Sequence, residues 1–158
     1  MLYATLKTLH LLSVIVWVGG MVFVQFFLRP ALGALEAPQR LRLMRMVLGR
    51  FFNAVALAAA LSLITGFWMM RRVAGHTAQT GVTTHLPLEW LVMAGLGALM
   101  VLIFVYIRVV PYPRLVAAVA AQDWPAGAAA LATIRRWVMV NLFLGVATVA
   151  LSQLGVTG

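Results

Sequence analysis

His10 lies inside the first long apolar stretch of the chain, residues 6–28, and no other histidine lies inside such a stretch. Lys7 and Trp17 share one helical face with it, because residues three, four or seven positions apart lie on neighbouring turns. An ionisable ring in a membrane-spanning helix is costly and by default marks a functional site. His10 is therefore the first candidate for metal or cofactor binding.

Four apolar stretches make up most of the chain. Of its 158 residues, 64% are hydrophobic and 9% are charged, whereas about 25% of the residues in a soluble domain are charged. A bilayer core about 30 Å thick is crossed by roughly 20 helical residues. Stretches of about that length are residues 6–28, 51–70, 90–110 and 137–154. The sequence predicts an all-α integral membrane protein, with residues 1–158 forming a single domain and an up-down four-helix bundle.

The first stretch is expected to be a retained span rather than a signal peptide. Its apolar run exceeds the roughly 7–15 residues of a secretory signal. Arg29 and Pro30 follow it in place of a small-residue cleavage site.

Cationic residues are distributed unevenly between the connections. The first and third connections and their borders hold Arg29, Arg40, Arg42, Arg45, Arg50, Arg108, Arg114, Arg135 and Arg136. The opposite side has only Lys7, Arg71 and Arg72. By the positive-inside rule both termini and the second connection are outside, which is the periplasm if the membrane is a bacterial inner membrane. We expect the arginines to contact anionic lipid headgroups, Lys7 to extend toward the outer headgroups, and nucleic acid not to be a partner.

The cytoplasmic connections are predicted to be helical. Pro38 suits the first turn of a helix that continues into the second span, and Asp123 suits the cap of a helix that leads into the fourth. Pro111 and Pro113 should interrupt the third span. Helices two to four should therefore extend past the membrane on the cytoplasmic side. The second connection, residues 73–87, is polar and is predicted to be an exposed external loop.

Small residues indicate where helices approach closely. The second span has Ala54, Ala58, Ser62 and Gly66 at intervals of four, and the fourth has Asn141, Gly145, Thr148 and Ser152 on one stripe.

Imidazole and thioether groups are predicted to gather near the external face. The chain has no cysteine, so thiolate sites are excluded. Imidazole with thioether suits Cu(I), and imidazole alone suits Cu(II). The sequence predicts a mixed His/Met copper site near the periplasmic face. Its candidate metal ligands are His10, Met69 and Met70 at the end of the second span, Met93 at the start of the third, and His76 and His85 in the connecting loop.

Other interpretations of these residues stay open. His10 could instead make a structural hydrogen bond to Ser13, to Asn141 or to a backbone carbonyl of another helix. The methionines could serve packing, and the loop histidines could be solvated. A b-type haem usually takes two axial ligands. Because His10 is the only histidine within a span, haem would need a methionine or a loop histidine as the second ligand.

Hydrolytic catalysis has little support. The only acidic residues are Glu36, Glu89 and Asp123, and all three lie at expected helix starts. No nucleophile–base pair is visible, so no catalytic residue is assigned.

Several segments together carry a family resemblance. The first helix has LHLLSVIVWVGG at residues 9–20 and LRPAL at 28–32. The second has RFFN at 50–53 and TGFW at 65–68, and the fourth begins with IRRWVMVNL at 134–142. These segments resemble the copper-resistance protein D (CopD) family. The resemblance implies an inner-membrane protein of copper uptake or tolerance, with His10 as a functional residue. A periplasmic copper carrier is a candidate partner.

A second family shares one part of this pattern. The Lys7, His10 and Trp17 spacing is similar to the first helix of HemJ-type protoporphyrinogen oxidases. That family continues with a Pro-Arg-Leu segment that ends in a histidine, whereas this chain has Leu-Arg-Pro-Ala-Leu and no histidine there. An enzyme of this type, a membrane oxidoreductase, is the alternative to copper handling.

Overall fold

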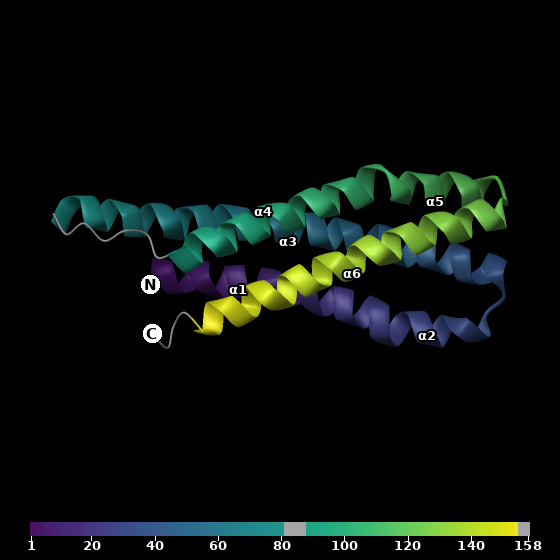
Figure 1. Cartoon of the computed structure of the whole chain (residues 1–158), viewed down its shortest axis with the longest axis horizontal. Coiled ribbons are helices and arrows are strands. Elements are labelled where there is room, and N and C mark those ends of the chain that lie inside the picture. Colours follow the sequence, from purple (N-terminus) through teal and green to yellow (C-terminus); the bar gives the residue numbers. More distant parts are fainter. Residues whose placement is uncertain (81–87, 155–158) are drawn as a thin grey trace.

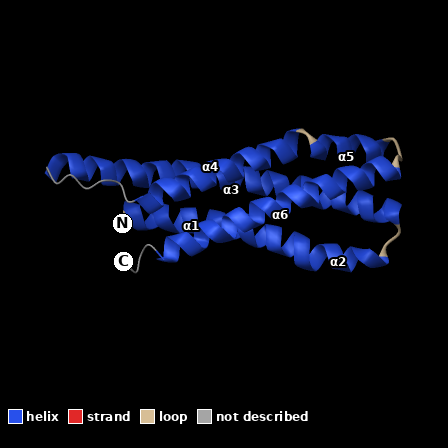
Figure 2. Ribbon diagram, in the orientation of Figure 1, coloured by secondary structure: helices blue, strands red, loops and turns tan. Residues whose placement is uncertain are grey.

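The computed structural model describes the backbone of residues 1–80 and 88–154, and the side chains of residues 1–72, 75 and 91–152. Helices form all of the regular structure in this part of the chain (Figure 2). They form four long, roughly antiparallel arms, and the beginning of α1 and the end of α6 lie at one end, called the terminal end below (Figure 1). The predicted all-α fold is confirmed.

The first arm is α1 (Leu2–Val22), a π-helical turn (Phe23–Leu28), the short α2 (Arg29–Ala31) and a 3-10 turn (Leu32–Ala34). The second arm is α3 (Ala37–Thr80). The third is α4 (Leu88–Val109) followed by α5 (Pro111–Ala120), and the fourth is α6 (Trp124–Leu154).

Four helical stretches are long and apolar enough to cross a membrane, and they are Leu2–Ala34, Ala37–Arg72, Leu91–Ala120 and Trp124–Ser152. They enclose most of the four predicted stretches. The second, third and fourth continue past their apolar segments at the end away from the terminal end, as predicted, and the first also continues, to Ala34, which was not predicted.

The predicted helix ends have the expected local causes. Pro38 lies in the first turn of α3, where its missing N–H costs no hydrogen bond. Pro111 begins α5 directly after the break at Val110. The Asp123 carboxylate oxygen Oδ1 accepts a hydrogen bond from the backbone N–H of Ala126 at 3.0 Å, as a capping aspartate does.

The π-helical turn in the first arm was not predicted. There the backbone N–H of Arg29 bonds to the carbonyl of Val24, five residues back. Pro30 follows directly, and a proline inside a helix removes one i→i−4 bond and clashes with the preceding turn. A widened turn accommodates this, and it carries the buried side chain of Gln25.

The prediction of a loop over residues 73–87 is wrong for its first part, because α3 continues to Thr80. Residues 73–80 contain no proline. Adding a residue to an existing helix gains a hydrogen bond without a new nucleation step. The backbone of His76 is therefore helical, whereas His85 lies outside the described residues.

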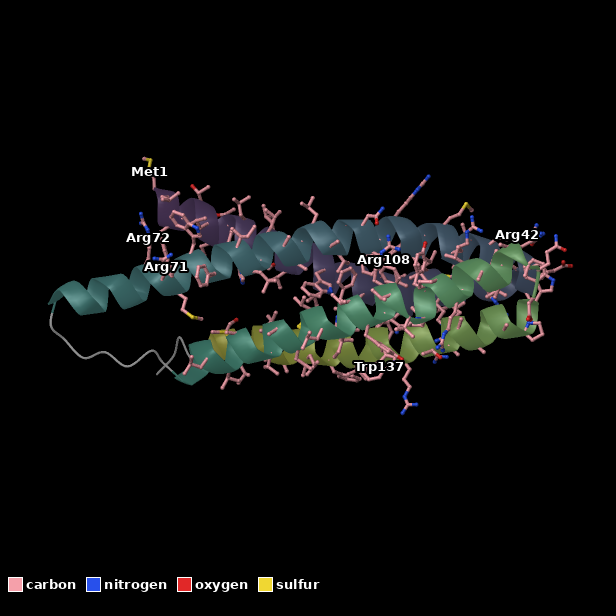
Figure 3. The ribbon with its side chains drawn as sticks, turned by 90° about the horizontal axis from the view of Figure 1, so that it is seen from above. Met1, Arg42, Arg71, Arg72, Arg108 and Trp137 are labelled. Carbon is pink, nitrogen blue, oxygen red and sulfur yellow. The ribbon has the colours of Figure 1, made fainter. Side chains whose placement is uncertain are left out.

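The packed core occupies the middle of the bundle and the end opposite the termini. Trp17, Phe52, Phe104 and Tyr112 form a chain of edge-on aromatic contacts that links α1, α3, α4 and α5. Figure 3 shows Met1, Arg71 and Arg72 at the terminal end and Arg42 at the other.

Candidate metal centre

The His10 ring of α1 is hydrogen-bonded to α3 through one nitrogen. Its Nδ1 lies 3.1 Å from the carbonyl oxygen of Ser62 and 3.0 Å from the hydroxyl Oγ1 of Thr65. A carbonyl oxygen can only accept, so Nδ1 must carry a proton and donate. The Thr65 hydroxyl donates in turn to the carbonyl of Leu61 at 2.6 Å, which leaves its oxygen free to accept from His10.

This network assigns the tautomer of His10, since the neutral ring carries one proton and shares it between two acceptors on α3. The other nitrogen, Nε2, then keeps its lone pair. A metal-binding histidine almost always donates its second N–H to a carbonyl, carboxylate or water, which fixes the ring and raises the basicity of the ligating nitrogen. Nε2 of His10 therefore has the protonation state and the support that a ligand needs.

The small-residue stripe of α3 provides the space for the ring. A Cβ atom at Gly66 would lie 3.5 Å from Cε1 and 3.9 Å from Nδ1 of His10. The imidazole therefore rests against the flat surface at Gly66, next to Ser62 and Thr65. The terminal part of the predicted stripe faces α1, where Gly66 meets the histidine itself, whereas Ala54 at its other end is exposed.

Of the three structural partners considered for His10, the structure shows the backbone carbonyl of another helix. Ser13 is occupied elsewhere, because its hydroxyl donates to the carbonyl of Leu9 at 2.8 Å. Asn141 lies further along the bundle, about one turn beyond Gly145. Thr65 was missed by the sequence reasoning. The available signal was a second polar residue three positions after Ser62 on the same apolar helix.

One buried polar atom next to His10 has no partner. The hydroxyl Oγ of Ser62 is buried without a hydrogen bond in the described part of the chain. Buried hydroxyls are normally satisfied by protein, water or a ligand. The His10 locus thus offers an unused nitrogen lone pair and an unused hydroxyl.

The predicted methionines lie at or near the depth of His10. Met69 and Met70 are half-buried and share one face of α3 with Ser62 and Gly66, one turn closer to the terminal end. Met93 is half-buried on α4.

The depth of Met93 follows from the helix register. A Cβ atom at Gly145 of α6 would lie 3.0 Å from Cγ2 of Val18 and 3.1 Å from Cε of Met100. Val18 and Met100 therefore lie at one depth. His10 is about 12 Å from Val18 along α1, and Met93 is about 10 Å from Met100 along α4, both toward the terminal end.

Carboxylates and further histidines do not complete a site within the described residues, where no group of three His, Cys, Asp or Glu side chains could hold a metal ion. The side chains of His76 and His85 are outside that part.

The remaining residues of the first-helix pattern have separate roles. Lys7 is exposed near the terminal end. Trp17 is buried and meets Phe104 edge-on, with ring centroids 6.2 Å apart, so it is a packing residue.

These observations define a multi-pass membrane protein with a supported histidine inside its bundle. A family model described as Copper resistance protein D (CopD) matches residues 45–154. The match covers more than half of the chain, so the protein belongs to the CopD family and is a copper resistance membrane protein. It includes the resembling segments of α3 and α6, whereas α1 with His10 lies before its first residue. No curated protein and no solved structure matches the chain.

Proposed function

We propose that this protein handles copper at the bacterial inner membrane and binds Cu(I) near the periplasmic face through Nε2 of His10. The observation that carries the proposal is the double hydrogen bond from Nδ1 to Ser62 and Thr65, which leaves Nε2 as a lone-pair donor. Family membership indicates which metal is bound, because copper resistance is the description of the matching family.

The thioethers would complete the coordination. Cu(I) is soft and monovalent, and it accepts imidazole and thioether ligands. Met69 and Met70 lie one turn from the His10 contact on α3, and Met93 reaches the same depth from α4. His76 and His85 are further candidate ligands. Neutral ligands of this kind suit a site that lies partly within the bilayer, because none of them adds a charge that would have to be desolvated.

The orientation follows from the excess of arginines at the end opposite the terminal end, and the contacts there are those of a membrane–water interface. The Arg42 guanidinium lies 5.3 Å from the centre of the Trp124 ring, and that of Arg108 lies 5.0 Å from the Tyr112 ring. Arginine with aromatic rings is typical of a membrane–water interface. This end would face the cytoplasm and its anionic lipids, while both termini and His10 would face the periplasm, where a copper carrier could deliver its ion.

The test is the Cu(I) content of the purified protein after anaerobic loading and desalting, measured by elemental analysis. His10→Ala should lose one copper per chain relative to the wild type. Ser13→Ala is the matched control, since Ser13 lies one turn away on α1, is buried, and bonds only to its own helix. It should keep the full copper content.

The proposal fails if His10→Ala retains as much copper as the wild type and the control. The same preparations distinguish the haem alternative. Protein from haem-replete cells should show no Soret-type absorption band. A strong band that disappears in His10→Ala would show that His10 binds haem and not copper.

A further inference from the structure

Asn141 is a buried polar residue that the His10 site does not use. It lies on α6, its side chain is only 2% exposed, and its oxygen Oδ1 has no hydrogen-bond partner among the described residues. Most buried polar side-chain atoms are paired, and an unpaired one calls for an explanation. Inside a membrane-spanning bundle the cost is greater, because no lipid group can supply the missing bond.

Two buried thioethers lie close to this amide in depth. Met100 of α4 is 5% exposed, and its sulfur lies 3.9 Å from the Cβ position of Gly145, which is one turn from Asn141 on α6. Met21 of α1 is 1% exposed and follows Val18 by one turn. Val18 also touches the Gly145 position, and α1 and α6 run in opposite directions, so Met21 and Asn141 lie level with each other.

The three side chains lie at similar depth on three different helices. The large ring of Trp17 on α1 meets that of Phe104 on α4 edge-on, with centroids 6.2 Å apart, so side chains bridge these two helices next to this layer. Gly145 keeps α6 close to both helices, since any side chain there would press against Val18 and Met100.

From this juxtaposition we propose a second Cu(I) subsite in the middle of the bundle, formed by the sulfurs of Met21 and Met100 and by Oδ1 of Asn141. It rests on the proposed function in one respect, namely that the cargo is copper. It would give an ion that has left His10 a second set of ligands about 16 Å further along α1.

The chemistry of the donors selects the ion. A hard cation such as Na⁺ or Mg²⁺ needs several oxygen ligands, and only one unpaired oxygen is present here. Thioethers bind soft monovalent copper, and methionine side chains can adjust through three rotatable bonds. The amide oxygen adds a dipole without a second charge. Asn141 then has a partner whenever the ion is bound.

The test counts copper ions in a set of variants loaded anaerobically with Cu(I). Wild type should bind two ions per chain, and His10→Ala should keep one. The double variant Met21→Leu/Met100→Leu should lose the core ion alone, and the same pair combined with His10→Ala should bind none. Met44→Leu is the matched control, because Met44 is also buried, at 4% exposure, but precedes Phe52 by about 12 Å along α3. It should bind two.

X-ray absorption of the single-copper His10→Ala protein should show sulfur neighbours that disappear with Met21 and Met100. If the double methionine variant keeps the wild-type copper content, the core subsite is refuted, whatever happens at His10. If His10→Ala keeps both ions while the double variant loses one, the periplasmic site fails and the core subsite stands.

Asn141→Leu tests the amide separately and should fold, because leucine removes an unpaired polar group at similar volume. Without copper its thermal midpoint should equal or exceed that of the wild type, and saturating Cu(I) should raise it less. If Cu(I) stabilises both proteins equally, Asn141 is not a ligand of the ion, and a buried water is the partner of its amide oxygen.

Discussion

Replacing Thr65 by valine removes one of the two acceptors that hold the His10 ring while keeping the shape of the side chain. Nδ1–H keeps the carbonyl of Ser62 at 3.1 Å, so the substitution leaves no unpaired donor. A neutral hydrogen bond contributes about 1 kcal/mol net. A difference of about 1.4 kcal/mol corresponds to tenfold in affinity, so we expect Cu(I) to bind about fivefold more weakly.

Two further variants serve as controls for the effect of Thr65→Val on copper affinity. Thr65→Ser restores a hydroxyl and should recover most of the affinity. Gly66→Ala places a methyl group 3.5 Å from Cε1 of His10, an ordinary van der Waals distance, and should change the affinity less than Thr65→Val. Together they separate the loss of a hydrogen bond from a change in packing.

The assay is competition for Cu(I) against a colorimetric chelator, and ¹⁵N NMR of the metal-free protein reports the tautomer directly. The spectrum should show a proton on Nδ1 and none on Nε2. The reasoning is refuted if Thr65→Val binds copper as tightly as Thr65→Ser, or if the proton is found on Nε2.

The remaining predictions concern the fold and its orientation. Asp123→Ala removes the cap of α6 and should lower the free energy of unfolding by about 1 kcal/mol without changing copper content; unchanged stability would contradict the capping role. Gly20→Ala places a methyl group against the Phe51 ring and should lower the free energy of unfolding by about 1–3 kcal/mol, measured by denaturant unfolding as for Asp123→Ala. Because the chain has no cysteine, single cysteines report topology. Tyr3→Cys should react with an impermeant reagent in intact spheroplasts, and Gly33→Cys only after lysis; the reverse pattern would invert the proposed orientation.

Much of the fold was readable from local properties of the chain. The apolar stretches predicted four helices of spanning length, Pro38 and Asp123 marked helix starts, and Pro111 marked the interruption of the third span, all of which the structure confirms. These features act within a few residues of themselves, through solvation, a missing N–H or a capping oxygen, so they do not depend on which helix lies next to which.

Two local features were misjudged or missed. Polar composition suggested a loop over residues 73–87, yet α3 continues to Thr80, because polar residues without proline can extend a helix that already exists. The π-helical turn at Phe23–Leu28 also escaped the sequence reasoning, although Pro30, two residues after it, is a residue that disturbs regular helix geometry.

The sequence by itself determined that His10 lies in a spanning helix and has no second histidine within any span. Only the tertiary structure decided what the ring touches. Its partners Ser62 and Thr65 are more than 50 residues away, and the tautomer that exposes Nε2 follows from them. The depth shared by Met21, Met100 and the unpaired amide oxygen of Asn141 is equally a matter of arrangement. The rotation and register of a helix are set by the sum of its contacts with all its neighbours, including close approaches at Gly66 and Gly145, and no short stretch of sequence contains that sum.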